Sequence, residues 1–438
     1  IMIPVVIQNI IIFSLNMIDS VILSKYGQSE FAASALANQA WFIYTVFMFG
    51  LATGACILTA QYYGKKDKDS ISAVMMIGMM FSLGISVIFA GVLFFAPGLF
   101  LRIYTNDAHL IFLGSKFLRI VAPSYLLTSV TMLYSSYLKS VEKAAAPLIF
   151  NGIALVINTV LNYFFVFGVG TFQGMGIEGS ALATLIARVV EVLILIYYFK
   201  NFEQFISLKI NIAKIKFLMP DFLKYCSPVL LNESLWGIGA SVHTAIFGRL
   251  GESVIAAFSV TTILERVGMI AALGLVQAAG VILGIELGRG SKESALKYSK
   301  YFMRLSAVFG LICGTLVYLA TPMVISVFSL APETAGLYSR FALVMGLFLT
   351  IKAFNMMGVC AILRSGGDSI AALFIDVGTM WLLTNPLGAV LAFKFSLAPA
   401  LVYLVLISEE MIKLPVVLYR MNQKHWLKDL TRVGEGSL

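Results

Sequence analysis

The sequence has few charged residues and few cysteines for its length. Only 12% of its 438 residues are charged and 60% are hydrophobic, which gives a mean hydropathy of +0.93. Soluble globular proteins carry about a quarter charged residues and less than about half apolar residues. This shortage of charge argues against soluble enzymes, nucleic-acid-binding proteins and disordered chains, although a net charge of +9 would suit a polyanion in a soluble protein.

Motifs for metal binding and covalent chemistry are missing as well. The sequence has no Walker-type phosphate loop, no His-Glu-x-x-His and no Gly-x-Ser-x-Gly. The four cysteines lie far apart, in or beside apolar stretches, a spacing that fits neither a disulfide framework nor a zinc site: Cys56, Cys226, Cys313 and Cys360. We therefore expect buried thiols, no enzymatic activity and no cofactor.

Long apolar runs are abundant. A helix that crosses a bilayer needs about 20 apolar residues, and charged or Gly/Pro-rich segments separate twelve such runs. They cover residues 3–24, 40–62, 72–96, 117–138, 147–168, 178–199, 228–248, 263–286, 302–328, 338–362, 371–393 and 397–419. The sequence predicts an all-α membrane protein with twelve transmembrane helices.

Lysine and arginine are distributed unevenly among the predicted loops. If the N-terminus is cytoplasmic, the inner loops hold roughly three times as many of these residues as the outer loops. The positive-inside rule then predicts a multi-pass protein of the inner (plasma) membrane, with both termini in the cytoplasm.

The chain repeats itself at a nearly fixed distance. A shift of about 224 positions superimposes identical residues: Pro4 and Pro228, Gly27 and Gly251, and Gly50 and Gly274. Each repeat contains six predicted helices, an even number, so both halves have the same orientation in the membrane. Parallel repeats of this kind are one standard architecture of secondary transporters.

The repeat divides the chain into two lobes and two connecting parts. The predicted parts are an N-lobe (1–199), a cytoplasmic linker (200–227), a C-lobe (228–420) and a cytoplasmic tail (421–438). The linker is basic and is broken by Pro220 and Pro228, so we expect one lobe to rock against the other. Within the tail, residues 421–433 are predicted to form an interfacial helix.

Three polar residues lie inside the predicted spans of the N-lobe. A charge inside a bilayer costs several kcal/mol, so Asp19 in the first helix is a functional candidate. Asn158 and Asn162 lie four residues apart in the fifth helix, hence on one face, at a depth similar to that of Asp19. Together their oxygens could hold a proton or a small hard cation such as Na⁺. The structural alternative is that Asp19 caps a helix or snorkels, while the asparagines join helices.

The C-lobe has charged residues of its own. Glu233 in the seventh helix and Lys352 in the tenth could form a pair in a cavity, or Lys352 could repel cations. The structural alternative is an ion pair or a snorkelled lysine. His243 is the repeat partner of Asp19, so the two lobes differ chemically. Other charges have a partner nearby in sequence and are predicted to neutralise one another: Arg188 with Glu191, Glu265 with Arg266, and Glu409 and Glu410 with Lys413.

Aromatic residues and methionines are plentiful. Most must face lipid or pack between helices, but flexible methionines and flat rings also suit a cavity that accepts many shapes. The candidate cavity residues are Asp19, Trp41, Tyr44, Tyr125, Glu233, Trp236 and Lys352.

These features resemble those of the bacterial MATE (multidrug and toxic compound extrusion) transporters, a family of the MOP flippase superfamily. The resemblance covers nearly the whole chain. It rests on Pro4 followed by Met17-Ile18-Asp19-Ser20, on the repeated glycines, and on Leu363-Arg364-Ser365-Gly366-Gly367-Asp368, which is similar to the family's Arg-Gly-x-x-Asp element.

The resemblance implies an antiporter that exports organic cations by alternating access, in exchange for inward H⁺ or Na⁺ as the coupling ion. Asp19 matches the family's first-helix coupling carboxylate and Asn158 its fifth-helix asparagine. Asn162 stands where some members carry a second aspartate, and Ser180 or Thr184 could supply the sixth-helix hydroxyl.

The sodium-coupled NorM-like branch of the family has a second site in the C-lobe, with a glutamate on helix seven and an aspartate on helix ten. Here Trp236 stands at the first of these positions, and Lys352 or Ala353 at the second. The resemblance therefore favours coupling through Asp19.

The expected partners are cationic or amphipathic drugs and the lipid bilayer, with no nucleic acid, and we expect a monomer. A flippase for lipid-linked sugars, from the same superfamily, is the main alternative. Such a protein should line its cavity with several arginines, and Lys352 and Arg188 alone make a weak case for one. The two-lobe repeat argues against a channel, and the missing motifs argue against a membrane-embedded enzyme.

Overall fold

The computed structural model describes residues 2–170, 172–202 and 211–432, and most of them are helical. Contacts divide the chain into two units, Ile3–Cys226 and Ser227–Leu438. The boundary between the units lies inside one long helix, α8 (Ile212–Arg249).

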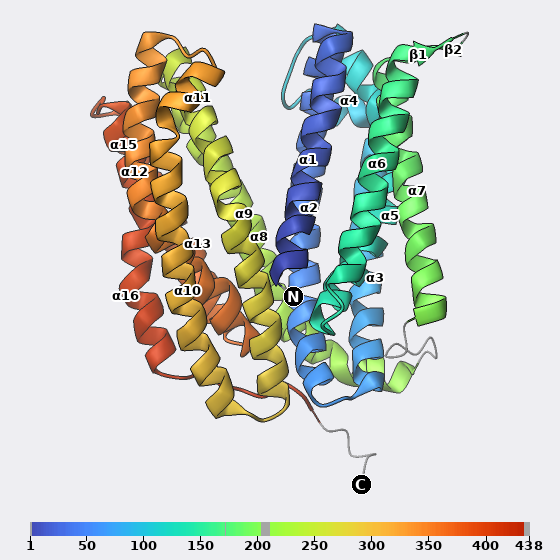
Figure 1. Cartoon of the computed structure of the whole chain (residues 1–438), viewed down its shortest axis with the longest axis vertical. Coiled ribbons are helices and arrows are strands. Elements are labelled where there is room, and N and C mark those ends of the chain that lie inside the picture. Colours follow the sequence, from blue (N-terminus) through green and yellow to red (C-terminus); the bar gives the residue numbers. More distant parts are fainter. Residues whose placement is uncertain (1, 171, 203–210, 433–438) are drawn as a thin grey trace. The chain divides into compact units, whose positions relative to one another are not determined.

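The first unit is a bundle of long helices with two small additions. Its elements are α1 (Met2–Tyr26), α2 (Gln28–Gly64), α3 (Lys68–Phe95), α4 (Pro97–Leu101), α5 (Ala108–Ser140), α6 (Ala145–Phe167), β1 (Gly168–Val169), β2 (Phe172–Gln173) and α7 (Ile177–Phe202). Figure 1 shows α4 and the antiparallel β1–β2 hairpin at one end of this bundle, and the turn between α2 and α3 at the other.

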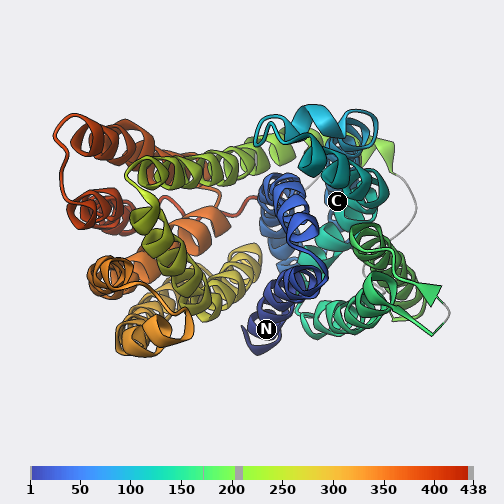
Figure 2. The same cartoon turned by 90° about the horizontal axis from the view of Figure 1, so that it is seen from above.

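The second unit repeats this plan, and Figure 2 shows its helices from above. After α8 follow α9 (Glu252–Gly288), α10 (Lys292–Leu319), α11 (Thr321–Val327), α12 (Pro332–Met356), η1 (Met357–Leu363), α13 (Ser369–Thr379), η2 (Met380–Thr384), α14 (Asn385–Phe393), α15 (Pro399–Ile407) and α16 (Glu409–Asn422). The segments η1 and η2 are π-helical turns, which often occur at functional positions in helices.

The twelve predicted spans are all found as helical segments. Among the described residues, nine helical segments are long and apolar enough to cross a membrane. The other three predicted spans coincide with α1, with α8, and with α15 followed by α16. The predicted fold class, an all-α membrane protein with twelve spans, is therefore confirmed.

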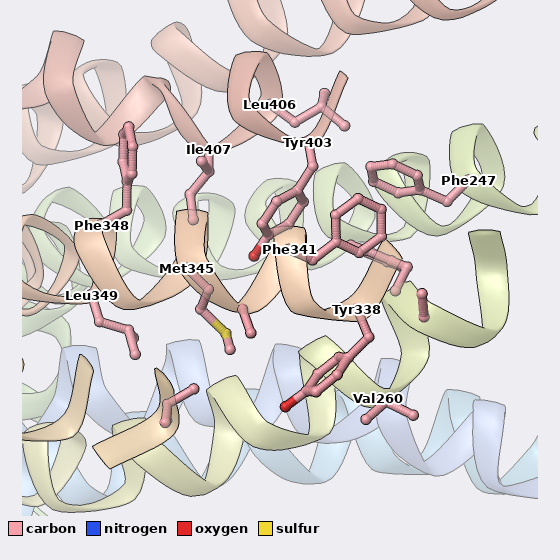
Figure 3. Close-up of a cluster of buried hydrophobic side chains, with 14 of the residues drawn as sticks. Phe247, Val260, Tyr338, Phe341, Met345, Phe348, Leu349, Tyr403, Leu406 and Ile407 are labelled. Atoms are coloured by element: carbon pink, nitrogen blue, oxygen red, sulfur yellow. The ribbon is translucent and has the colours of Figure 1, made fainter. Parts of the chain in front are cut away.

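The core of the second unit is built from aromatic rings that four helices contribute. Phe247 of α8 stacks on Phe258 of α9, with ring centroids 4.4 Å apart. Phe341 of α12 packs on Tyr403 of α15 at 5.0 Å. Figure 3 shows Phe247, Phe341 and Tyr403 of this cluster. All four rings are buried.

Glycines allow α10 and α12 to approach each other closely. Gly310 and Gly314 form a Gly-x-x-x-Gly pair, the spacing that lets membrane helices pack backbone to backbone. A Cβ atom on Gly314 would lie 2.3 Å from the carbonyl oxygen of Gly346. Neither backbone can yield without separating the helices.

We therefore expect Gly314→Ala to destabilise the protein by about 1–3 kcal/mol, the usual cost of overpacking. The measurement is the thermal unfolding midpoint in detergent. Gly84→Ala is the matched control, because Gly84 lies in α3 with nothing within 4 Å of an added Cβ. Equal midpoints for the two variants would contradict this packing argument.

The predicted linker differs from the structure. Residues 203–210 lie outside the described part, but α8 begins at Ile212, so Pro220 and Pro228 lie inside a helix. The start of α8 belongs to the first unit and packs within it: Phe222 stacks on Phe81 with centroids 5.8 Å apart. Prolines are tolerated within membrane helices because neighbouring groups satisfy the freed backbone atoms.

Lys214 also anchors the start of α8, to the carboxylate of Asp67 at 3.3 Å. Asp67 caps α3 by accepting hydrogen bonds from the backbone N–H and the hydroxyl of Ser70. Burial raises the pKa of Asp67, but these hydrogen bonds and the Lys214 charge outweigh it, so the pKa lies below its usual value.

The predicted interfacial helix over 421–433 is also wrong within the described residues. The helix α16 ends at Asn422, and Lys424 adopts a left-handed backbone conformation with φ of 57°. Trp426 is then buried among residues of the second unit, and its indole N–H donates to the carbonyl oxygen of Met421 at 3.3 Å. The tail buries its tryptophan in protein, which removes the apolar face that a surface helix would need.

Candidate functional site

Asp19, near the end of α1, is hydrogen-bonded to α6. The amide nitrogen of Asn162 donates to Asp19 Oδ1 at 2.5 Å. Asn162 is fully buried, and Asp19 is partly buried. The structure thus brings together the carboxylate and one of the two asparagines that the sequence places at a similar depth.

Asn158, one turn before Asn162, connects α6 to α7. Its amide nitrogen donates to Thr184 Oγ1 at 3.3 Å, and the Thr184 hydroxyl donates to the carbonyl oxygen of Ser180 at 3.1 Å. Of the two hydroxyls considered from the sequence, that of Thr184 contacts the asparagine. Ser180 contributes its backbone oxygen to the chain of hydrogen bonds.

Both asparagines have an oxygen without a donor. The Oδ1 atoms of Asn158 and Asn162 are buried, and no described residue donates to either of them. A buried acceptor left without a donor costs about 1–3 kcal/mol, so these oxygens are suited to contact a bound cation or a proton donor. No three His, Cys, Asp or Glu side chains converge as metal ligands anywhere in the described residues.

Arg188 of α7 is the cation that acts electrostatically on Asp19. Its guanidinium donates to Glu191 at 2.6 Å, so the pair predicted from the sequence is present. The guanidinium also lies over the ring of Trp41, 5.4 Å from the ring centroid. Its positive charge is thus already shared between a carboxylate and an aromatic face.

Two of the candidate cavity residues form part of the core. Tyr44 and Tyr125 are 0% and 1% exposed, and their ring centroids are 4.6 Å apart. The Tyr44 hydroxyl donates to the carbonyl oxygen of Tyr125 at 2.6 Å. In this structure both rings join α2 to α5, because the tyrosine hydroxyl finds its partners inside the bundle, and Trp41 is the part of this group that stays partly exposed.

The second unit contains a bridge of the same kind in the equivalent helices. His243 of α8, the repeat partner of Asp19, forms a hydrogen bond from its Nε2 to Asn385 Oδ1 at 2.7 Å. Asn385 begins α14, in the fifth span of the second repeat. Sequence reasoning missed Asn385 because its distance from Asn162 differs by about one residue from the repeat shift.

Glu233 and Lys352, for which a mutual pair was one alternative, have different partners. Glu233 accepts a hydrogen bond from Arg364 at 2.6 Å, and Lys352 pairs with Glu265 at 2.5 Å. Trp236, also a candidate cavity residue, is 37% exposed on α8.

Glu265 has a partner that the sequence did not predict, Lys352, whereas its neutralisation by Arg266 stays a prediction. Adjacent residues on a helix point about 100° apart and do not face each other. Glu265 is turned toward Lys352, and Arg266 is exposed.

The neutralisation of Glu409 and Glu410 by Lys413 holds in part. Lys413 lies 3.3 Å from Glu409 but 2.8 Å from Asp376 of α13. Glu410 accepts from the amide of Asn355 at 2.9 Å. Sequence reasoning missed Asp376 and Asn355, although each is a polar residue inside a predicted span, which is the signal that identified Asp19.

Comparisons with known proteins agree with the repeat. The family model described as MatE matches twice, over residues 4–164 and 228–390. A "probable multidrug resistance protein NorM" of Thermotoga maritima is 22% identical over 402 residues, which cover 90% of this chain and 85% of that protein. The "multidrug resistance protein MdtK" of Yersinia enterocolitica is 21% identical, with 91% and 88% covered.

A solved structure supports the same fold. A crystal structure described as "MATE in the bent conformation" superimposes with a TM-score of 0.86 at 18% identity, covering 96% of this chain and 93% of that one. At this identity the likeness establishes the fold, and the residues above define the candidate site.

Proposed function

The chain belongs to the MatE family, and from this premise we propose that it is a secondary active multidrug efflux antiporter. It exports organic cations from the cytoplasm, acting as a monomer in the plasma membrane with both termini inside. Inward flow of H⁺ or Na⁺ drives the export. The names of the relatives, which include multidrug resistance proteins, support the substrate class.

The observation that carries the proposal is the Asp19–Asn162 bridge. In this bridge the carboxylate of Asp19 contacts Asn162, whose buried amide oxygen has no donor, and the same holds for the oxygen of Asn158 one turn away. Protonation or sodium binding from outside neutralises Asp19 and lowers the affinity of the site for a cationic drug. Loss of the ion to the cytoplasm restores the negative charge and with it the affinity.

Asp19 in this scheme serves the ion and the drug in turn. The partly exposed ring of Trp41 offers a flat surface to an organic cation, which cation–π attraction favours. Arg188 already lies against that ring. A drug cation therefore competes with the guanidinium for the same aromatic face.

Gradient-driven transport in liposomes tests the proposal. The wild-type protein should move a fluorescent organic cation under an imposed H⁺ gradient or an imposed Na⁺ gradient, and collapse of that gradient should stop the flux. The gradient that works identifies the coupling ion. Absence of flux under both gradients would contradict the antiport proposal.

Lipid flipping is less favoured because the two cations that the sequence offered for it are partly buried and already paired. Arg188 is paired with Glu191 and Lys352 with Glu265. A site for a pyrophosphate-bearing lipid needs cations whose charge is available to phosphate oxygens.

A further inference from the structure

The second unit encloses a cluster of ionisable side chains that the proposed function does not use. Four carboxylates and two ammonium groups come from four helices: Glu265 of α9, Lys352 of α12, Asp376 of α13, and Glu409, Glu410 and Lys413 of α16. Glu409 and Glu410 are each 5% exposed and Lys413 is 2% exposed. Charges are almost never buried to this degree unless they are paired.

The two ammonium groups do not neutralise the four carboxylates. Lys352 forms an ion pair with Glu265, with 2.5 Å between Nζ and Oε1. Lys413 lies 2.8 Å from Asp376 and 3.3 Å from Glu409. The adjacent pair of Glu233 with Arg364 is balanced in itself. With all carboxylates ionised, the cluster would hold two more negative than positive charges in a medium of low dielectric constant, where such an excess is costly.

The hydrogen bonds show the same imbalance. Glu409 Oε2 is buried and receives no hydrogen bond from any described residue. The Oδ1 atoms of Asn355 and Asn232 are also buried without a donor, although their amide nitrogens donate to Glu410 and to Asp376. The side chains of the cluster itself therefore offer more hydrogen-bond acceptors than donors.

Glu409 has the weakest hydrogen bonds and ion pairs of the four carboxylates. Glu410 receives a hydrogen bond from Asn355, Glu265 receives one from Lys352, and Asp376 receives two, from Lys413 and from Asn232. Glu409 has only the longer contact to Lys413, on its own helix. It is thus the carboxylate for which the neutral, protonated form costs least.

The helices that pack on α16 bring no further cation to Glu409. Lys352 comes from α12 and Asp376 from α13, and both act on Glu409 electrostatically. The turn η1 carries the thiol of Cys360, followed by Arg364, which is paired with Glu233. Tyr403 of α15 has a buried hydroxyl without a partner among the described residues, and η2 carries no titratable side chain.

We propose that Glu409 is a proton-binding site of the second unit. The carboxylate takes up H⁺ at Oε2, the atom without a donor, and no other bond is made or broken. A proton is favoured over a metal ion because no three acidic, His or Cys side chains converge as ligands within the described residues. Lys413, shared between Asp376 and Glu409, controls whether Glu409 is protonated. When the ammonium group moves toward Glu409, it stabilises the carboxylate, and the proton is released.

Proton binding at Glu409 follows from the buried charges alone, whereas its use in transport rests on the proposed antiport. In that case the second unit carries a proton in addition to the ion at Asp19. Its release would be coupled to any movement of α13 against α16, since these are the helices that share Lys413.

Infrared spectroscopy of the whole protein in liposomes tests the binding. We expect a C=O band of a buried protonated carboxyl group at neutral pH, lost in Glu409→Gln and kept in Glu410→Gln, because Glu410 Oε2 already accepts a hydrogen bond from Asn355. A band that is unchanged in Glu409→Gln overturns the proposal. If that variant does not fold, Glu409→Asp should shift the frequency of the band, and an unshifted band would overturn the proposal equally.

The ratio of protons to drug molecules tests the role in coupling. Glu409→Gln should transport with fewer protons per organic cation than the wild type. An unchanged ratio, with the infrared band lost, would overturn the coupling role. A wild-type protein that transports no drug would refute the proposed antiport, and the infrared result would still decide whether Glu409 binds a proton.

Discussion

Asp19→Asn is expected to reduce gradient-driven export of an organic cation to the level of protein-free liposomes. The substitution preserves the size of the side chain and keeps an oxygen that accepts from Asn162, so the bridge between α1 and α6 can persist. What it removes is the group that gains and loses charge. Without that change the drug site has the same affinity on both sides of the membrane, and a gradient cannot drive net transport.

Two controls separate this effect from a loss of structure. Asp69→Asn removes an exposed carboxylate of α3 in the same unit and should transport as the wild type does. The unfolding midpoint of Asp19→Asn should be no lower than that of the wild type, because a neutral amide costs less to bury than a charge. Full transport by Asp19→Asn would show that another group couples the ion.

The fold was largely predictable because membrane helices leave a strong signal. Each span must be apolar over about 20 residues, and the repeat shows up in glycines such as Gly27 and Gly251. The linker and the tail were predicted poorly for the opposite reason. Their structures depend on contacts distant in sequence, such as Phe222 on Phe81 and the burial of Trp426.

The candidate site could be predicted only for polar residues that lie at a similar depth in their membrane helices. Asp19 and Asn162 could be matched because both are polar residues at a similar depth in their helices. Pairs such as Lys352 with Glu265 could not, since sequence neighbours offer Arg266 as the partner, and only the rotation of α9 decides which residue Glu265 faces. The rotation of a helix about its own axis is set by packing against its neighbours, and the apolar runs in the sequence do not predict it.

Arg364→Ala is expected to cause the largest loss of stability among single substitutions of charged residues. Arg364 is 1% exposed, and its guanidinium donates to Glu233 at 2.6 Å. Breaking a buried ion pair by removing one partner costs about 3–5 kcal/mol, because the remaining charge stays buried without compensation. The thermal unfolding midpoint in detergent should fall accordingly. Arg289→Ala, which breaks the exposed pair with Glu286, should cost no more than about 1 kcal/mol.

A double variant shows whether the loss of stability comes from the buried charge that is left without a partner. In Glu233→Gln combined with Arg364→Met both charges are gone, so most of the lost stability should return even though the ion pair is absent. The single variant Glu233→Gln should be nearly as unstable as Arg364→Ala, because the guanidinium is then the stranded group. If the double variant is as unstable as Arg364→Ala, Arg364 acts through other contacts of its buried side chain. Recovery would instead mean that this residue of the Arg-Ser-Gly-Gly-Asp turn is buried as half of an ion pair.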